Sequence, residues 1–168
     1  MGLDMYLIGE KYLFTQYDKE SHKPIPGHRE KITEMTPELK DHPDSKNEYK
    51  NAGQIDTMRR TLIYWRKSNE IHKWFVDTVQ DGVDDCGRHR VDLSDLENLL
   101  SVCKEVVATK NTELLPRQEG FFFGSTEYDE DYYKGLEYTI KRLEFVLSKD
   151  ESGKYIFGAW DLFYASSW

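Results

Sequence analysis

Cysteine and long apolar runs are both scarce in this sequence, and each scarcity excludes a class of protein. Only Cys86 and Cys103 occur among 168 residues, too few for a disulfide framework, so we expect a reducing, cytoplasmic environment. No segment approaches the run of about 20 apolar residues that a membrane-spanning helix needs, and the N-terminus lacks a basic segment followed by an apolar one. We therefore expect a protein that is neither exported nor inserted in a membrane.

Positive charge is also in deficit. The chain has 23 Lys and Arg against 31 Asp and Glu, a net charge of -8, and most of the excess acid lies after residue 67. Such a charge favours solubility and opposes non-specific attraction to nucleic acid, so we expect no direct nucleic-acid binding. The acidic half is either a solvated surface or a match for a partner with a basic groove.

Aromatic residues are abundant and compensate for the low hydrophobic fraction of 38%. The chain has 11 Tyr, 8 Phe and 4 Trp, and large rings bury much apolar area per residue. We predict one α+β domain over residues 1–168, in which a small, mostly antiparallel sheet includes both termini and is packed by about three helices.

The strands are predicted from runs of β-forming residues. Residues 3–14 and the aromatic segment 155–168 favour terminal strands that lie beside each other. Residues 61–65 favour a strand that leads directly into a helix capped by Ser68 and ended by Asp81-Gly82.

Two further helices are predicted from caps and apolar spacing. Ser94 with Glu97 has the pattern of a capping box, and a buried stripe that includes Cys103 follows it. Thr126 with Asp129 offers a second capping pattern, for a helix that runs to about residue 148.

Residues 15–56 contrast with the rest of the chain. They hold four of the five prolines and three of the five histidines, with few apolar anchors. We expect a long, polar and mobile insertion in the single domain.

The first candidate ligand site lies where the strand at 61–65 meets its helix. Free backbone amides at a helix start attract anions, Tyr and Trp rings stack on bases, and Arg engages phosphate with a planar fork of donors. The alternative is that Trp74 and Phe75 belong to the core and that the cations line a solvated face. The candidate residues are Tyr64, Trp65, Arg66, Lys67, Asn69 and His72.

The second candidate is the segment Gly120–Gly124 with the residues after it. Glycines let the backbone approach a ligand, and hydroxyl groups at a helix start add donors, which nominates Gly124, Ser125, Thr126 and Tyr128. The alternative, a buried strand followed by a capped helix, also explains every residue type here. The Lys-Ser/Thr ending of a P-loop is absent.

Metal and catalytic patterns are weak. Cys86 and His89 have the spacing of half a zinc site, but Cys103 and His72 do not form a paired second half. No nucleophile elbow, dinucleotide fingerprint or zinc-protease pair occurs. We predict no metal, no cofactor and no catalytic residue, and binding is favoured over catalysis.

Three runs carry a resemblance to a known group of proteins. They are the opening Met-Gly-Leu-Asp-Met-Tyr-Leu, the segment from Tyr64 to Phe75, and the segment from Gly120 to Asp129. Together they resemble a family of small uncharacterised proteins encoded in phages and prophages. The resemblance spans both ends and most of residues 57–148, and it leaves out residues 15–56. The resemblance assigns no catalytic residue to this chain. It implies a phage context, in which small proteins often block a host process such as antiviral defence.

Three hypotheses follow from that context. In the first, the protein sequesters an anionic nucleotide signal in the host cytoplasm through Arg66, Lys67, His72 and aromatic rings. In the second, acids near Glu127 to Asp131 mimic phosphates and occlude a host nuclease or CRISPR effector. In the third, the domain is a small nucleotide-processing enzyme. The sequence leaves the oligomeric state open.

Overall fold

The computed structural model describes residues 2–12, 18–23 and 57–168. Two compact units are distinguished: residues 1–9 with 60–168, and residues 10–59. The first unit holds the helices described below and most of each long strand. Apart from a turn at 18–23, the insertion predicted at 15–56 lies outside the described residues.

A four-stranded antiparallel sheet forms the base of the fold within the described part of the chain. Its strands are β1 (Asp4–Tyr12), β2 (Thr57–Arg66), β3 (Arg88–Val91) and β4 (Asp161–Ser167), in the spatial order β2-β1-β4-β3. The two terminal strands are neighbours, as predicted, and the α+β class is confirmed. The short strand β3 was not predicted.

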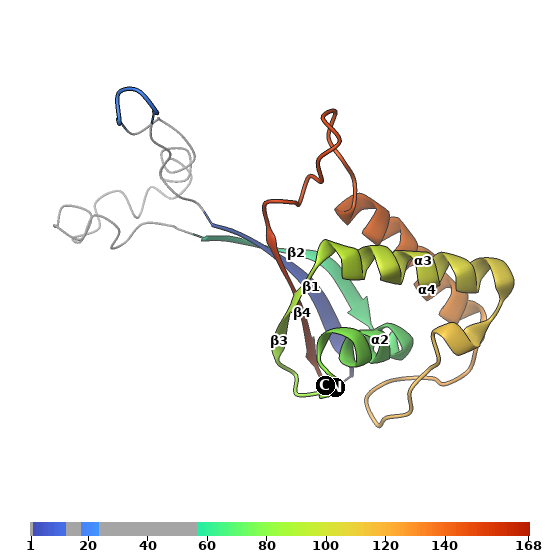
Figure 1. Cartoon of the computed structure of the whole chain (residues 1–168). Helices are drawn as coiled ribbons and strands as arrows, with labels where there is room; N and C mark the ends of the chain where they lie inside the picture. Colours follow the sequence, from blue (N-terminus) through green and yellow to red (C-terminus); the bar gives the residue numbers. More distant parts are fainter. Residues whose placement is uncertain (1, 13–17, 24–56) are drawn as a thin grey trace. The chain divides into compact units, whose positions relative to one another are not determined.

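Three α-helices of the described residues pack on one side of this sheet (Figure 1). They are α2 (Asn69–Val79), α3 (Leu93–Thr109) and α4 (Glu130–Val146), and a 3-10 turn, η3 (Thr112–Leu114), follows α3. No helix in the described ranges is both long and apolar enough to cross a bilayer.

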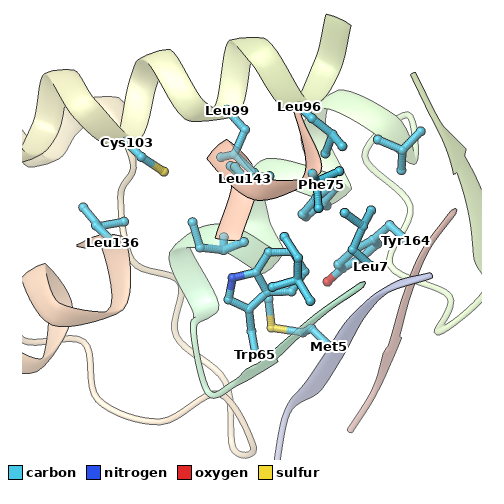
Figure 2. Close-up of a cluster of buried hydrophobic side chains, with 14 of the residues drawn as sticks. Met5, Leu7, Trp65, Phe75, Leu96, Leu99, Cys103, Leu136, Leu143 and Tyr164 are labelled. Atoms are coloured by element: carbon cyan, nitrogen blue, oxygen red, sulfur yellow. The ribbon is translucent and has the colours of Figure 1, made fainter. Parts of the chain in front are cut away.

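The core lies between the helices and the sheet (Figure 2). Successive strand residues point to opposite faces, so Met5 and Leu7 of β1 enter the core and are fully buried. The ring of Tyr164 stacks on that of Phe75, with centroids 4.0 Å apart and planes 10° apart. Aromatic pairs of this kind stabilise a core beyond the area they bury.

Two helix starts differ from the predicted ones. The N-cap of α3 is Asp92, which forms a capping box with Asp95, in place of Ser94. The N-cap of α4 is Asp129, whose carboxylate accepts hydrogen bonds from two backbone N–H groups of the first turn. In both cases an Asp carboxylate takes the capping position, and Asp caps as well as Ser and better than Thr.

The prediction of a buried strand at Gly120–Gly124 is wrong. Phe123 N–H donates to Gly120 C=O at 3.0 Å, which closes a turn. Phe121 is 96% exposed, whereas Phe123 is 7% exposed. Gly124 has φ of 95°, a conformation that glycine adopts without strain.

Candidate functional site

The face of the sheet turned away from the helices carries a group of rings and arginines. We call this the outer face and define it by Asp4 and Tyr6 of β1, Tyr64 and Arg66 of β2, Phe163 and Asp161 of β4, and Arg88 and Arg90 of β3. These positions alternate along their strands with core residues such as Met5, Trp65 and Leu162. The outer face therefore follows directly from the strand pattern.

Tyr64 and Arg66, two of the predicted ligand residues, lie on the outer face. The rings of Tyr64 and Tyr6 are 5.4 Å apart between centroids. Tyr64 is 42% exposed, and its hydroxyl donates to the Asp4 carboxylate, a hydrogen bond that raises the pKa of Tyr64. The Arg66 side chain is 63% exposed, and its Nε lies 4.0 Å from Asp4 Oδ1. A cation and two rings thus share a small exposed area.

Lys67 lies at the junction of β2 and α2, beside the turn that ends at Gly124. Its backbone has φ of 57°, and its N–H donates to Leu3 C=O at 2.8 Å. A Cβ added to Gly124 would come within 3.1 Å of Lys67 Cβ. Glycine suits position 124 because its φ is 95° and the two segments pack closely, and these two features account for Gly124 without any ligand.

Asn69 holds the loop that precedes α4. It is fully buried, and its amide nitrogen donates to Phe123 C=O at 3.1 Å and Ser125 C=O at 3.0 Å. Its amide oxygen accepts from Gln118 N–H at 3.0 Å. All these bonds go to backbone groups, so Asn69 fixes loop geometry and does not face a ligand.

His72 is buried on the helix side of the sheet. Its Nδ1 lies 2.6 Å from the Tyr164 hydroxyl and its Nε2 lies 2.8 Å from Asp84 Oδ2. Trp168 Nε1 donates to the other Asp84 oxygen at 3.3 Å. Both ring nitrogens are occupied, so His72 ties α2 to β4 and to the turn before β3.

The prediction that Arg66 and His72 bind one ligand together is therefore corrected. Arg66 points to the outer face, whereas His72 is 0% exposed and packs among core residues. Trp65, 2% exposed, also points inward, where Nε1 donates to Thr139 Oγ1 at 3.0 Å. The alternation of β2 and the start of α2 place neighbouring residues of the motif on opposite sides of the sheet.

The remaining predicted residues belong to the exposed loop before α4. Ser125 C=O accepts from the Arg117 guanidinium, and Ser125 Oγ accepts from Glu127 N–H at 3.0 Å. The Tyr128 hydroxyl accepts from Arg117 N–H at 3.1 Å. Thr126 is exposed. These contacts are local and give the loop its shape.

A buried ion pair, Glu70 with Arg117, was not predicted. Arg117 Nε lies 3.8 Å from Glu70 Oε2, and the two side chains are 8% and 2% exposed. Among the described residues neither atom has a hydrogen-bond partner. Burial raises the pKa of Glu70, and the charge of Glu70 adds to burial in raising the pKa of Cys103 to about 12. The sequence gives no sign of this pair, because a Glu in the first turn of a helix is typical of a solvated surface.

Two of the metal-site candidates lie in different surroundings, since Cys86 is exposed and Cys103 is buried. The described part of the chain brings together no group of three or more His, Cys, Asp or Glu side chains suited to a metal ion. Comparison with protein-family models found no match, and neither did comparisons with curated proteins or with solved structures.

Proposed function

We propose that this protein is a non-catalytic, phage-type binding protein that antagonises host antiviral defence by sequestering an anionic nucleotide signal on its outer face. The observation that carries the proposal is Arg66 beside the paired rings of Tyr6 and Tyr64. Bases stack on aromatic rings without regard to sequence, and a guanidinium binds phosphate through a fork of donors. The site therefore offers a surface for the base and a cation for the phosphate.

The exposed ion pair between Arg66 and Asp4 suits exchange for a ligand. At 4.0 Å and with 63% of the Arg66 side chain exposed, such a pair contributes little to stability. Arg66 can turn to a phosphate at small cost, and Asp4 keeps its hydrogen bond from Tyr64. The rings sit on paired strands, which hold a binding surface more rigidly than a loop does.

Calorimetric titration tests the proposal. Cyclic mononucleotides, cyclic dinucleotides and cyclic ADP-ribose isomers are titrated into the wild-type protein, into Arg66→Ala and into Lys134→Ala. Lys134 is an exposed cation of α4 and controls for the loss of one positive charge. We expect tight binding of at least one nucleotide by the wild type and Lys134→Ala, and at least tenfold weaker binding by Arg66→Ala. Absence of heat with every nucleotide removes the proposal, and recovery of altered nucleotide would indicate an enzyme instead.

A second candidate function is occlusion of a basic groove on a host nuclease or CRISPR effector. The observation that favours it is the exposed run of acids at the start of α4, Glu127 and Asp129 to Asp131, in a chain of net charge -8. A complex of this kind weakens steeply with salt. Retention of such a partner at low salt, lost when Glu127 and Asp131 are changed to Gln and Asn but kept in Arg66→Ala, would favour this function over sequestration.

A further inference from the structure

The outer face continues beyond Tyr64 and Arg66 into a second group of rings and cations. On β4, Phe163 lies between the core residues Leu162 and Tyr164, so its ring turns to the outer face. Arg88 of β3 lies over this ring, with its guanidinium carbon 3.7 Å from the centroid. Arg90 pairs with Phe163 in the strand register. This half of the outer face thus repeats the combination of ring and arginine found on β1 and β2.

The outer face is less acidic than the molecule as a whole. Its three arginines, Arg66, Arg88 and Arg90, stand against Asp4, Asp161 and also Asp92, which follows β3 and lies 3.9 Å from Arg90, so its charge balances near zero in a chain of net charge -8. Arg90 Nη2 lies 3.0 Å from Asp161 Oδ1, and both side chains are more than half exposed, so this ion pair is solvated and Arg90 can exchange it for a ligand. Cations are therefore concentrated on the face that also carries rings.

The strand order sets a minimum distance that a ligand contacting both groups must span. Tyr64 and Phe163 lie on strands separated by one other strand, β1, and neighbouring strands are about 4.8 Å apart, which separates the two strands by roughly 10 Å. A single base is too small to stack on both rings. Two bases joined through phosphate can bridge such a separation, one on the Tyr64 ring and one on the Arg88 guanidinium that lies over the Phe163 ring.

On these grounds we infer that the outer face holds a dinucleotide, with one base at Tyr6 and Tyr64 and the second at a subsite formed by Phe163 and Arg88. This inference rests on the proposed function and adds the ligand class and the second subsite. Stacking on each ring tolerates any base, so the number of bases matters more than their identity.

The test compares AMP, the linear dinucleotide pApA and the single strand dA8 as probes, by fluorescence titration at fixed salt. For the wild type we expect pApA to bind at least tenfold more tightly than AMP, and dA8 within about threefold of pApA. Phe163→Ala should reduce this preference to less than about threefold, because one stacking contact contributes a factor of about 5 to 150. Phe121→Ala removes a ring that is 96% exposed and lies off the sheet, so it should keep the preference.

Arg88→Gln provides a second variant that leaves the ring in place, and it should lower the affinity for pApA by about fivefold or more. Equal binding of AMP and pApA by the wild type, or an unchanged preference in both Phe163→Ala and Arg88→Gln, overturns the second subsite while the proposed function stands. Failure of all three probes to bind overturns the dinucleotide, and the calorimetric titration with cyclic nucleotides then decides the proposed function separately. Binding of dA8 more than tenfold tighter than pApA also overturns the dinucleotide and points to single-stranded nucleic acid.

Discussion

Tyr6 and Tyr64 lie side by side on β1 and β2, with ring centroids 5.4 Å apart and planes inclined by 35°. Both rings are on the outer face, and the Tyr64 hydroxyl donates to Asp4. The pair therefore combines a stacking surface with a fixed orientation, because the hydrogen bond holds the Tyr64 ring in place.

This relationship predicts different effects for two substitutions of Tyr64. Tyr64→Phe keeps the ring and loses the hydroxyl, so nucleotide affinity should change by less than about threefold. Tyr64→Ala removes the stacking surface and should weaken binding about 5- to 150-fold, the range found for base stacking. Fluorescence titration measures both. Equal losses in the two variants would contradict a stacking role for the ring.

The turn at 120–124 predicts a contrast between two phenylalanines that are two residues apart in the sequence. Phe121→Ala should change the free energy of unfolding by less than about 0.5 kcal/mol, since its side chain is 96% exposed. Phe123→Ala should cost about 3 kcal/mol, because Phe123 packs in the core. Urea unfolding of both variants measures the difference, and comparable losses would show that the turn is misassigned.

His72 is predicted to act in stability and not in ligand binding. His72→Leu leaves the Tyr164 hydroxyl and the Asp84 carboxylate without their present partner, at a cost of about 2–4 kcal/mol. The matched change His89→Leu affects a histidine whose side chain is 27% exposed and should cost less than about 1 kcal/mol. Nucleotide affinity of folded His72→Leu, measured below its unfolding midpoint, should equal that of the wild type. A large loss of affinity would instead return His72 to the binding site.

Glu70 is predicted to make stability depend on pH. Burial raises the pKa of Glu70 above its ordinary value of 4.5, and a backbone hydrogen bond and Arg117 oppose this rise. Between the unfolded pKa and the raised folded pKa the native state binds more protons, so the contribution of Glu70 to stability falls as pH rises through that window. The native protein is favoured at the acidic end of the window.

Glu70→Gln removes this titration. The free energy of unfolding of Glu70→Gln minus that of the wild type should therefore increase as pH rises from about 4.5, whatever the offset caused by leaving Arg117 without its counterion. Urea unfolding at a series of pH values measures this difference. The control is Glu97→Gln, which changes an exposed Glu of α3. A difference that stays constant with pH would contradict the raised pKa.

Local patterns predicted the elements of the fold, and long-range contacts account for what was missed. Runs of β-forming residues were sufficient to predict β1, β2 and β4, and the apolar stripes of the helices were sufficient to predict the three helices and the buried Cys103. The strand β3 has four residues, too few for a periodic signal. The helix starts were predicted at the wrong residues because Asp and Ser or Thr are all good N-cap residues. Asp92 caps α3 where Ser94 was predicted, and Asp129 caps α4 where Thr126 was predicted.

Local patterns also predicted only part of the candidate site. Tyr64 and Arg66 were identified from one segment, but Tyr6 and Phe163 join them only once the strand order is known. Asn69 and His72 were predicted to bind a ligand, because a polar residue near a helix start can either bind a ligand or form hydrogen bonds within the protein. Their hydrogen bonds reach Gln118 and Tyr164, far along the chain, and no local pattern predicts such partners.

The central claim is that the outer face binds a nucleotide, and backbone amide NMR spectra recorded during titration with pApA test it most directly. The account predicts chemical-shift changes concentrated at Tyr6, Tyr64, Arg66 and Phe163, with little change along α3 and α4. Changes that cluster on those helices, or no change at millimolar pApA, would contradict it.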